Sequence, residues 1–168
     1  MSKKLNFGII GTGGMGANHL ASCMEIPGVN VIAIADADKE RLKTITEKHG
    51  IKNTFSDYHA LLRMKSIDAV CICLPNYLHA PAAIAAFEAG KHVLCEKPPA
   101  RNAKEAESMV KSSAKAKKKL MFAFHQRFGE KAGILKRYIE DGELGEIYYA
   151  KTGWMRRKRC AKGWFTDK

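Results

Sequence analysis

The sequence predicts an α/β fold in which a doubly wound parallel sheet carries helices on both faces. Short apolar runs alternate with helical patterns along most of the chain, which is typical of repeated strand–helix–strand units. A glycine-rich turn, Gly11–Gly16, joins the first apolar run to the first helical pattern. The run Asp68–Leu74 is apolar without alternation, as expected of a strand that is covered on both faces.

The expected strands are short and largely apolar, and six of them suffice for a complete doubly wound sheet. In chain order they are Leu5–Ile10, Val29–Ala35, Lys52–Phe55, Asp68–Leu74, His92–Cys95 and Leu120–Phe124. The expected helices between and after them are Met15–Glu25, Asp38–His49, Asp57–Met64, Leu78–Ala89, Ala103–Lys118 and Glu130–Asp141. The last of these is amphipathic, with four apolar residues expected to face inward: Ile134, Leu135, Tyr138 and Ile139.

The pattern changes after Gly145, where Glu146–Gly153 is expected to form one long strand. A lone strand cannot bury a face, so we interpret it as the first strand of a second, α+β domain. The expected organisation is a first domain over residues 1–125, followed at 126–168 by a connecting helix and the truncated start of a second sheet.

The composition, with 46% hydrophobic and 27% charged residues, is that of a soluble globular protein. No apolar run approaches the roughly 18 residues that span a bilayer, and the N-terminus has no signal-peptide pattern. Five cysteines without framework spacing favour reduced thiols and a cytoplasmic location. We expect Cys71 and Cys73 to face opposite sides of the sheet as core residues, and we predict no metal site.

The net charge of +12 is concentrated in the last third of the chain, at Lys115–Lys119 and Arg156–Arg159. The first cluster suits the carboxyl end of a helix. The second is interpreted as a surface that meets another domain or subunit, and polyanion binding is the alternative. A nucleic-acid-binding protein is the less favoured class, because no aromatic platform accompanies the charge, although Trp154 and Trp164 flank it.

The glycine-rich turn has the spacing of a dinucleotide-binding loop, in which the first glycine allows a tight turn and the third position lets backbone amides approach a pyrophosphate. The last glycine permits close helix–strand packing, and the helix N-terminus attracts the phosphate charge. The expected cofactor-binding residues of this loop are Gly11, Thr12, Gly13, Gly14, Met15 and Gly16. The sequence therefore predicts a Rossmann domain, and a glycine-rich turn of some other α/β fold is the alternative.

Asp36 ends the second expected strand, 20 residues past Gly16, where a carboxylate can accept both adenosine ribose hydroxyls. The same carboxylate would repel a 2′-phosphate, and Ala37 offers nothing to hold one. We therefore predict NAD, with NADP less favoured. Lys39 and Arg41 are nearby, and we interpret them as solvated residues of the first helical turn.

The segments Ile72–His79 and Ala89–Pro98, the second containing Glu-Lys-Pro, strongly resemble the Gfo/Idh/MocA family of glucose–fructose oxidoreductase and inositol dehydrogenase relatives. The resemblance covers essentially the whole chain, as far as Gly163–Phe165. It implies an N-terminal NAD(P)-binding Rossmann domain, a C-terminal sheet domain that completes the substrate pocket, and hydride transfer between nicotinamide and a sugar or cyclitol hydroxyl or ketone.

The resemblance implies further cofactor-binding residues at the carboxyl ends of two strands: Leu74, Pro75, Asn76, His79, Glu96, Lys97 and Pro98. The bond before Pro98 is often cis in the family. Lys97 is also the expected catalytic residue, because an ammonium there can stabilise alkoxide charge; pairing with Glu96 or Asp36 is the alternative. Arg127 matches a position near the substrate.

His125 is a candidate general base, although a hydrogen-bonded histidine at a strand end is the favoured interpretation. The resemblance implies a proton-accepting His, four residues after an Asp, in the second domain, and no His follows His125. We therefore expect a catalytically incomplete oxidoreductase, and the alternative is a stand-alone NAD-binding module that acts as a sensor or assembles with a partner chain. We also expect a homo-oligomer, formed through the segment from about Gly145.

Overall fold

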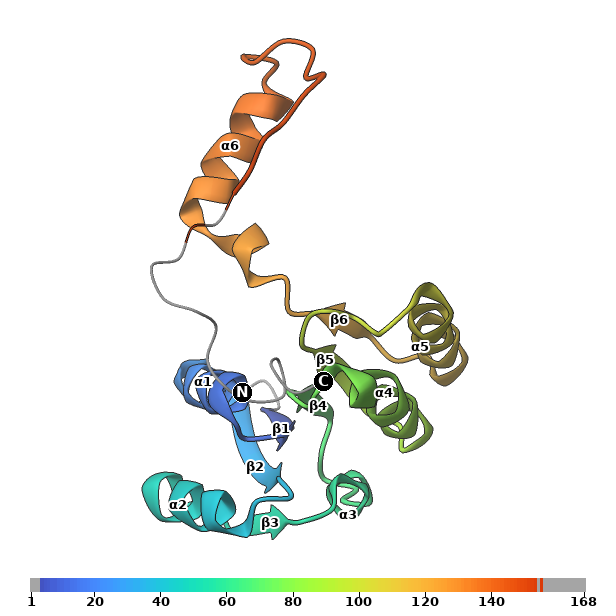
Figure 1. Ribbon diagram of the computed structural model, residues 1–168. Coiled ribbons are helices and arrows are strands. Elements are labelled where there is room, and N and C mark those ends of the chain that lie inside the picture. The colour runs from blue at the N-terminus through green and yellow to red at the C-terminus, as the bar shows by residue number, and fades with distance from the viewer. Residues whose placement is uncertain (1–3, 154, 156–168) are drawn as a thin grey trace. The chain divides into compact units, whose positions relative to one another are not determined.

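The structure, a computed structural model, describes residues 4–153 and 155. At its centre is a parallel sheet with the strand order β3-β2-β1-β4-β5-β6 (Figure 1). The strands are β1 Leu5–Ile10, β2 Val29–Ala35, β3 Asn53–Phe55, β4 Ala69–Ile72, β5 His92–Cys95 and β6 Leu120–Phe122. The predicted doubly wound sheet is thereby confirmed. Its two edge strands, β3 and β6, have three residues each.

The helices begin close to the positions that the sequence predicts, and three of them start at a side-chain cap. They are α1 Gly14–Glu25, α2 Lys39–His49, α3 Tyr58–Leu62, α4 His79–Glu88, α5 Ala103–Ala116 and α6 Glu130–Glu140, with short 3₁₀ turns η1 Asn76–Leu78 and η2 His125–Phe128. The caps are Asp38, Asp57 and Asn102, whose side chains accept a backbone hydrogen bond from the first turn. No helix among the described residues is long and apolar enough to cross a membrane.

Two apolar clusters cover the opposite faces of the sheet. One joins Ile9, Ile34 and Cys71 to residues of α1 and α2, and the other joins Ile10 and Ile72 to residues of α3, α4 and α5. Figure 1 accordingly shows α1 and α2 on one side of the sheet and α4 and α5 on the other. The strand order reverses between β1 and β4, and a doubly wound sheet opens a crevice for ligands at this point, beyond the carboxyl ends of its strands.

A buried lysine ties the start of β5 to the connection between α3 and β4. Lys91 is 5% exposed, and its Nζ donates hydrogen bonds to the carbonyl oxygens of Met64 and Ile67, each at 2.8 Å. Burial lowers the pKa of Lys91 below its usual value. The side chain thus acts as a tie between two backbone segments rather than as a surface cation.

The chain divides into two units, Met1–Ala123 and Phe124–Lys168, and two predictions for the second unit are wrong. Residues 146–153 form no strand in the described part of the chain, because a strand needs a neighbour to accept its hydrogen bonds. The apolar residues of α6 that were expected to face inward are 38–55% exposed, because the described residues of this unit supply no layer that covers them.

Candidate functional site

The glycine loop between β1 and α1 has two positions where only glycine fits. Gly11 has a φ of +83°, and a Cβ there would lie 2.6 Å from the carbonyl oxygen of Cys73. A Cβ on Gly16 would collide with the carbonyl oxygen of Gly11. These two residues therefore allow the close approach of the loop, the helix and the end of β4, as the spacing of the motif predicts.

The middle of the same loop is open. No atom lies within 4 Å of a Cβ built on Gly14, and the nearest atom to one on Gly13 is Nη1 of Arg41, at 3.9 Å. Helix α1 begins after Gly13 with no side-chain cap and no acidic residue in its first turn. Its first N–H groups can therefore meet an anion, and this end of the site fits a pyrophosphate.

Asp36, directly after β2, is held by three neighbours. Its Oδ2 accepts hydrogen bonds from the backbone N–H and the hydroxyl of Thr12, at 2.7 and 2.8 Å, and its Oδ1 accepts one from the N–H of Asp38 at 2.9 Å. Nη1 of Arg41 lies 3.2 and 3.1 Å from the two carboxylate oxygens. Burial alone would raise the pKa of Asp36, but these hydrogen bonds outweigh it, and the pKa lies below the usual 3.8.

Arg41 differs from its sequence-based interpretation as a solvated residue. Its guanidinium pairs with Asp36 at 3.1 Å and with Asp38 at 3.0 Å, while its side chain stays 43% exposed. The start of the helix brings it there, because α2 begins at Lys39, directly after its N-cap Asp38, and Arg41 lies in the first turn. The carboxylate expected to meet the ribose therefore has a cation beside it.

Glu96, directly after β5, is 5% exposed and joins two segments. Its Oε1 lies 2.8 Å from Nε2 of His19 on α1, and its Oε2 accepts a hydrogen bond from the N–H of Lys97 at 3.0 Å. His19 carried no signal in the sequence beyond its place on the inner face of α1. Glu96 therefore links the first helix to the Glu-Lys-Pro turn.

Lys97 projects from that turn as an exposed side chain. Among the described residues, its ammonium forms no ion pair with Glu96 or Asp36, so the alternative of a structural pair is not borne out there. The Lys97–Pro98 peptide bond is cis, as the resemblance implies.

His79, the first residue of α4, is buried and bridges the two segments that follow β4 and β5. Its Nε2 lies 2.8 Å from the carbonyl oxygen of Leu74, and its Nδ1 lies 2.8 Å from that of Pro98. Pro75 and Asn76 lie between, at the start of η1. The predicted residues after β4 and those after β5 are thus joined through one imidazole.

The prediction that Cys71 and Cys73 face opposite sides of the sheet is wrong. Their sulfur atoms lie 3.6 Å apart, because residues two apart on a strand point to the same face. The sulfur of Cys73 and burial together raise the pKa of the Cys71 thiol. A ring nitrogen of His19 lies within 4.8 Å of both sulfurs.

His125 and Arg127 belong to the second unit and lie in η2. Both are exposed. A ring nitrogen of His125 lies 3.3 Å from the amide nitrogen of Gln126, and the guanidinium of Arg127 lies 5.8 Å from the centre of the Phe124 ring. The basic cluster at 156–159, Trp154, Trp164 and the Gly163–Phe165 segment fall outside the described residues.

Residues 5–124 match the family model GFO_IDH_MocA, described as an oxidoreductase family with an NAD-binding Rossmann fold. The chain belongs to this family. The match contains every predicted cofactor residue and ends one residue before His125.

Relatives of this Gfo/Idh/MocA chain include dehydrogenases of sugars and cyclitols. It is 33% identical to D-glucoside 3-dehydrogenase of Escherichia coli over 99% of this chain and 48% of the relative, and 32% identical to myo-inositol 2-dehydrogenase of Thermotoga maritima over 84% and 42%. A structure of scyllo-inositol dehydrogenase from Lactobacillus casei with bound NAD(H) and scyllo-inositol superposes on this chain with a TM-score of 0.83. The sequence identity is 26%, and the match covers 86% of this chain and 43% of that structure's chain. The chain spans less than half the length of these relatives.

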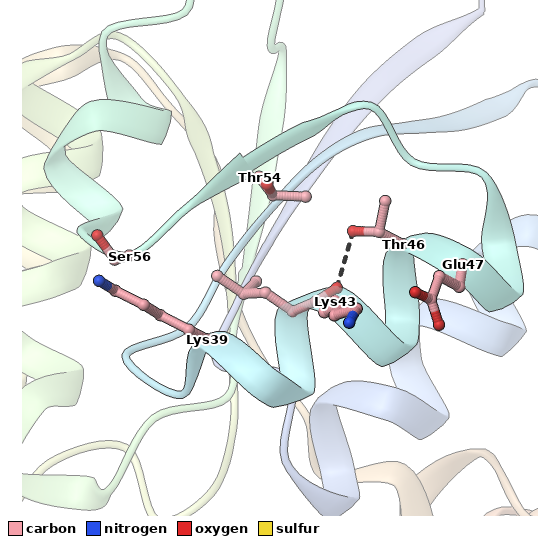
Figure 2. A pocket seen from close by; sticks show the side chains of 7 residues that line it. Lys39, Lys43, Thr46, Glu47, Thr54 and Ser56 are labelled. Carbon is pink, nitrogen blue, oxygen red and sulfur yellow. Dashed lines mark hydrogen bonds between the residues drawn. The ribbon is translucent and has the colours of Figure 1, made fainter.

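A groove of about 420 Å³ between α2 and β3 lies apart from the predicted site of this Gfo/Idh/MocA chain (Figure 2). It contains none of the predicted cofactor residues. Its floor and walls carry two lysines and several hydroxyl groups, and Thr46 uses its hydroxyl to bond the carbonyl oxygen of Leu42 at 2.7 Å. Its lining consists of Lys39, Leu42, Lys43, Thr46, Glu47, Thr54 and Ser56.

Proposed function

We propose that this chain binds NAD(H) and forms the cofactor-binding part of a dehydrogenase that interconverts a hydroxyl and a ketone on a sugar or cyclitol. The observation that carries the proposal is the open, uncapped start of α1, which lies between Gly11 and Gly16, the two positions where only glycine fits. Asp36 lies at the end of the neighbouring strand, where it suits a ribose. The relatives, which include glucoside and inositol dehydrogenases, supply the substrate class.

The preference for NAD over NADP rests on the charge of Asp36. Its lowered pKa keeps the carboxylate ionised at neutral pH, and an ionised carboxylate repels a 2′-phosphate. Arg41 is the nearest cation, but it already pairs with Asp36 and Asp38. A 2′-phosphate would have to displace both carboxylates from this guanidinium.

The bound nicotinamide supplies or accepts the hydride, and the residues of this chain bind and orient the cofactor and the substrate. Leu74, Pro75 and Asn76 are proposed to lie along the cofactor, with Glu96 and Pro98 shaping the turn beside it. Lys97, an exposed residue, is proposed to hydrogen-bond the reacting oxygen through its ammonium and to stabilise negative charge that develops on it. Arg127 is proposed to hold a substrate hydroxyl, and His125 to be a candidate general base.

A second proposal of a different class is a stand-alone NAD-binding module. The turn that holds the cofactor is complete within the first unit, whereas His125 and Arg127 belong to the second. Binding without turnover would favour this module, or a catalytic set completed by residues outside these 168. We also propose that copies of the chain associate through the segment from Gly145, whose Tyr148 and Tyr149 are 96% and 73% exposed.

The test is a calorimetric titration of NADH into the wild-type chain and into Gly14→Glu. No atom lies near a Cβ at this position, so a glutamate fits the fold, and its charge at a helix N-terminus favours the helix. The same negative charge would repel the pyrophosphate of the cofactor. We expect the Kd for NADH to rise by at least about tenfold, which is 1.4 kcal/mol, with no loss of thermal stability.

Asn18→Glu is the matched control, because it places the same charge on an exposed position one turn further along α1 and should change the Kd little. NADP should bind the wild-type chain more weakly than NAD. Equal effects of the two glutamates, or no binding of NADH to the wild-type chain, would contradict the proposal. Hydride transfer to or from a panel of sugars and cyclitols then separates the two proposed functions.

A further inference from the structure

Three side chains of types that can bind a metal ion meet behind the glycine loop, on the face of the sheet covered by α1. They are His19 of α1, Cys71 of β4 and Cys73 directly after it. One ligand atom from each lies within 4.8 Å of the other two, and among the described residues no other group of three His, Cys, Asp or Glu side chains comes together in this way. Cofactor binding as proposed above uses none of the three.

The separation of the two sulfurs suits coordination of a single ion. Two thiolates bound to one tetrahedral zinc at about 2.3 Å each lie about 3.8 Å apart, and the observed distance is 3.6 Å. A histidine nitrogen in the same shell lies about 3.6 Å from each sulfur, so His19 must approach by about 1 Å. The side chain of His19 is 19% exposed, and a change in its side-chain torsions can supply that approach.

A carboxylate already holds the histidine. Oε1 of Glu96 lies 2.8 Å from Nε2 of His19, and the Glu96 side chain is 6% exposed. Metal-binding histidines commonly have such a carboxylate partner, which fixes the ring and raises its basicity. The cluster therefore has two thiols, an imidazole and a carboxylate that holds the imidazole.

We propose that His19, Cys71 and Cys73 form a binding site for a thiophilic closed-shell metal ion, Zn²⁺ or Cu⁺. Thiolate sulfur selects such ions over Mg²⁺ or Ca²⁺, and imidazole is compatible with both. Binding replaces the two S–H bonds with two metal–sulfur bonds, so two protons leave for each ion bound and no oxidant or reductant is required. Cys73 packs against Gly11 and Gly16, so the ion lies directly behind the dinucleotide loop.

The first experiment titrates the full 168-residue chain, reduced and free of oxygen, with Co²⁺ as a spectroscopic substitute for Zn²⁺. We expect one ion per chain, a thiolate-to-cobalt charge-transfer band that Zn²⁺ abolishes by displacement, and release of about two protons per ion. Cu⁺ is titrated separately against a chromogenic Cu⁺ chelator. Tighter retention of one ion than of the other identifies the preferred metal.

Variants test whether these residues are the ligands. Cys73→Ser, at a half-buried position, and Cys71→Ser should each weaken binding and reduce the intensity of the charge-transfer band by at least half, and Glu96→Gln should weaken binding by about 10–100-fold. His49→Ala, at the end of α2, should leave stoichiometry and band unchanged, and so should Cys160→Ser. Circular dichroism checks that each variant is folded.

Two results would overturn the site. One is the absence of stoichiometric binding of both Zn²⁺ and Cu⁺ to the reduced wild-type chain. The other is a charge-transfer band that keeps its full intensity in folded Cys73→Ser or disappears in Cys160→Ser. Because these measurements need no dinucleotide, they succeed or fail independently of NAD(H) binding.

Discussion

Asp36 is subject to opposing influences on its charge. Burial disfavours the carboxylate, whereas the N–H groups of Asp38 and Thr12, the Thr12 hydroxyl and the Arg41 guanidinium favour it, and the net effect is a lowered pKa. When the pKa of a group is lower in the folded chain than in the unfolded chain, the group stabilises the fold at pH values above its pKa in the unfolded chain. That contribution is lost as the pH falls through the folded pKa.

Asp36→Asn should therefore lower the free energy of unfolding at neutral pH by about 1.5–3 kcal/mol, the usual contribution of hydrogen bonds to a charged group. The difference in the free energy of unfolding from the wild-type chain should be complete above pH 3.8 and should shrink as the pH falls below that value. Urea unfolding across this range measures the effect. Glu25→Gln, at an exposed position of α1, is the control, and a difference for Asp36→Asn that does not change with pH would contradict the assignment.

The sequence identified the residues whose role follows from local spacing and missed those whose role follows from tertiary contact. Gly11 and Gly16 have a characteristic place relative to a strand end, and the close packing around both is what that place predicts. Asp36 has such a place too, and its contact with a ribose stays a prediction. His19 has no such signature, because its partner Glu96 lies 77 residues further along the chain. The cysteine pair could have been found, since alternation along the strand places residues two apart on one face.

At the scale of elements, periodicity located the strands and tertiary pairing decided their ends. β6 was expected to reach Phe124, but it ends at Phe122, which pairs with Cys95, the last residue of β5. A strand persists only while its neighbour offers hydrogen-bonding partners. The same rule explains why residues 146–153, although they have a strand-like composition, form no strand in the described structure.

Lys91→Met tests how elements are tied together. Methionine fills the space of the lysine stem but leaves the carbonyl oxygens of Met64 and Ile67 without the ammonium that now meets them at 2.8 Å. We expect a loss of about 1–3 kcal/mol in the free energy of unfolding, measured by chemical denaturation. Lys111→Met, which removes an 81% exposed side chain on α5, should stay within about 0.5 kcal/mol of the wild-type chain, and equal losses for the two variants would contradict a structural role for Lys91.

At the scale of the whole molecule, the two units differ in how they bury apolar residues. The first has a cluster on each face of its sheet. In the second unit, Phe128 is 71% exposed and Leu135 is 55% exposed, and Tyr148 and Tyr149 are exposed as well. Exposed large apolar side chains favour an interaction site when they lie together on a surface, and we expect one in the second unit.

The expected outcome is self-association that depends on concentration, measured by size-exclusion chromatography with light scattering. Replacing Tyr148 and Tyr149 together by serine should shift the chain towards the monomer, because it removes aromatic contact area. Tyr77→Ser, which changes a 53% exposed tyrosine in the first unit, should not. A wild-type chain that stays monomeric at all concentrations would exclude association through this segment.

The two edge strands of the sheet, β3 and β6, are each three residues long. A sheet edge exposes unpaired N–H and C=O groups, which can recruit a strand from another molecule. Edges this short offer little template for such growth, whereas the longer strands β1 and β2 are enclosed within the sheet. The arrangement thus protects the folded first unit against edge-to-edge aggregation into fibrils, a hazard that rises only if the outer strands are lengthened or the sheet is opened.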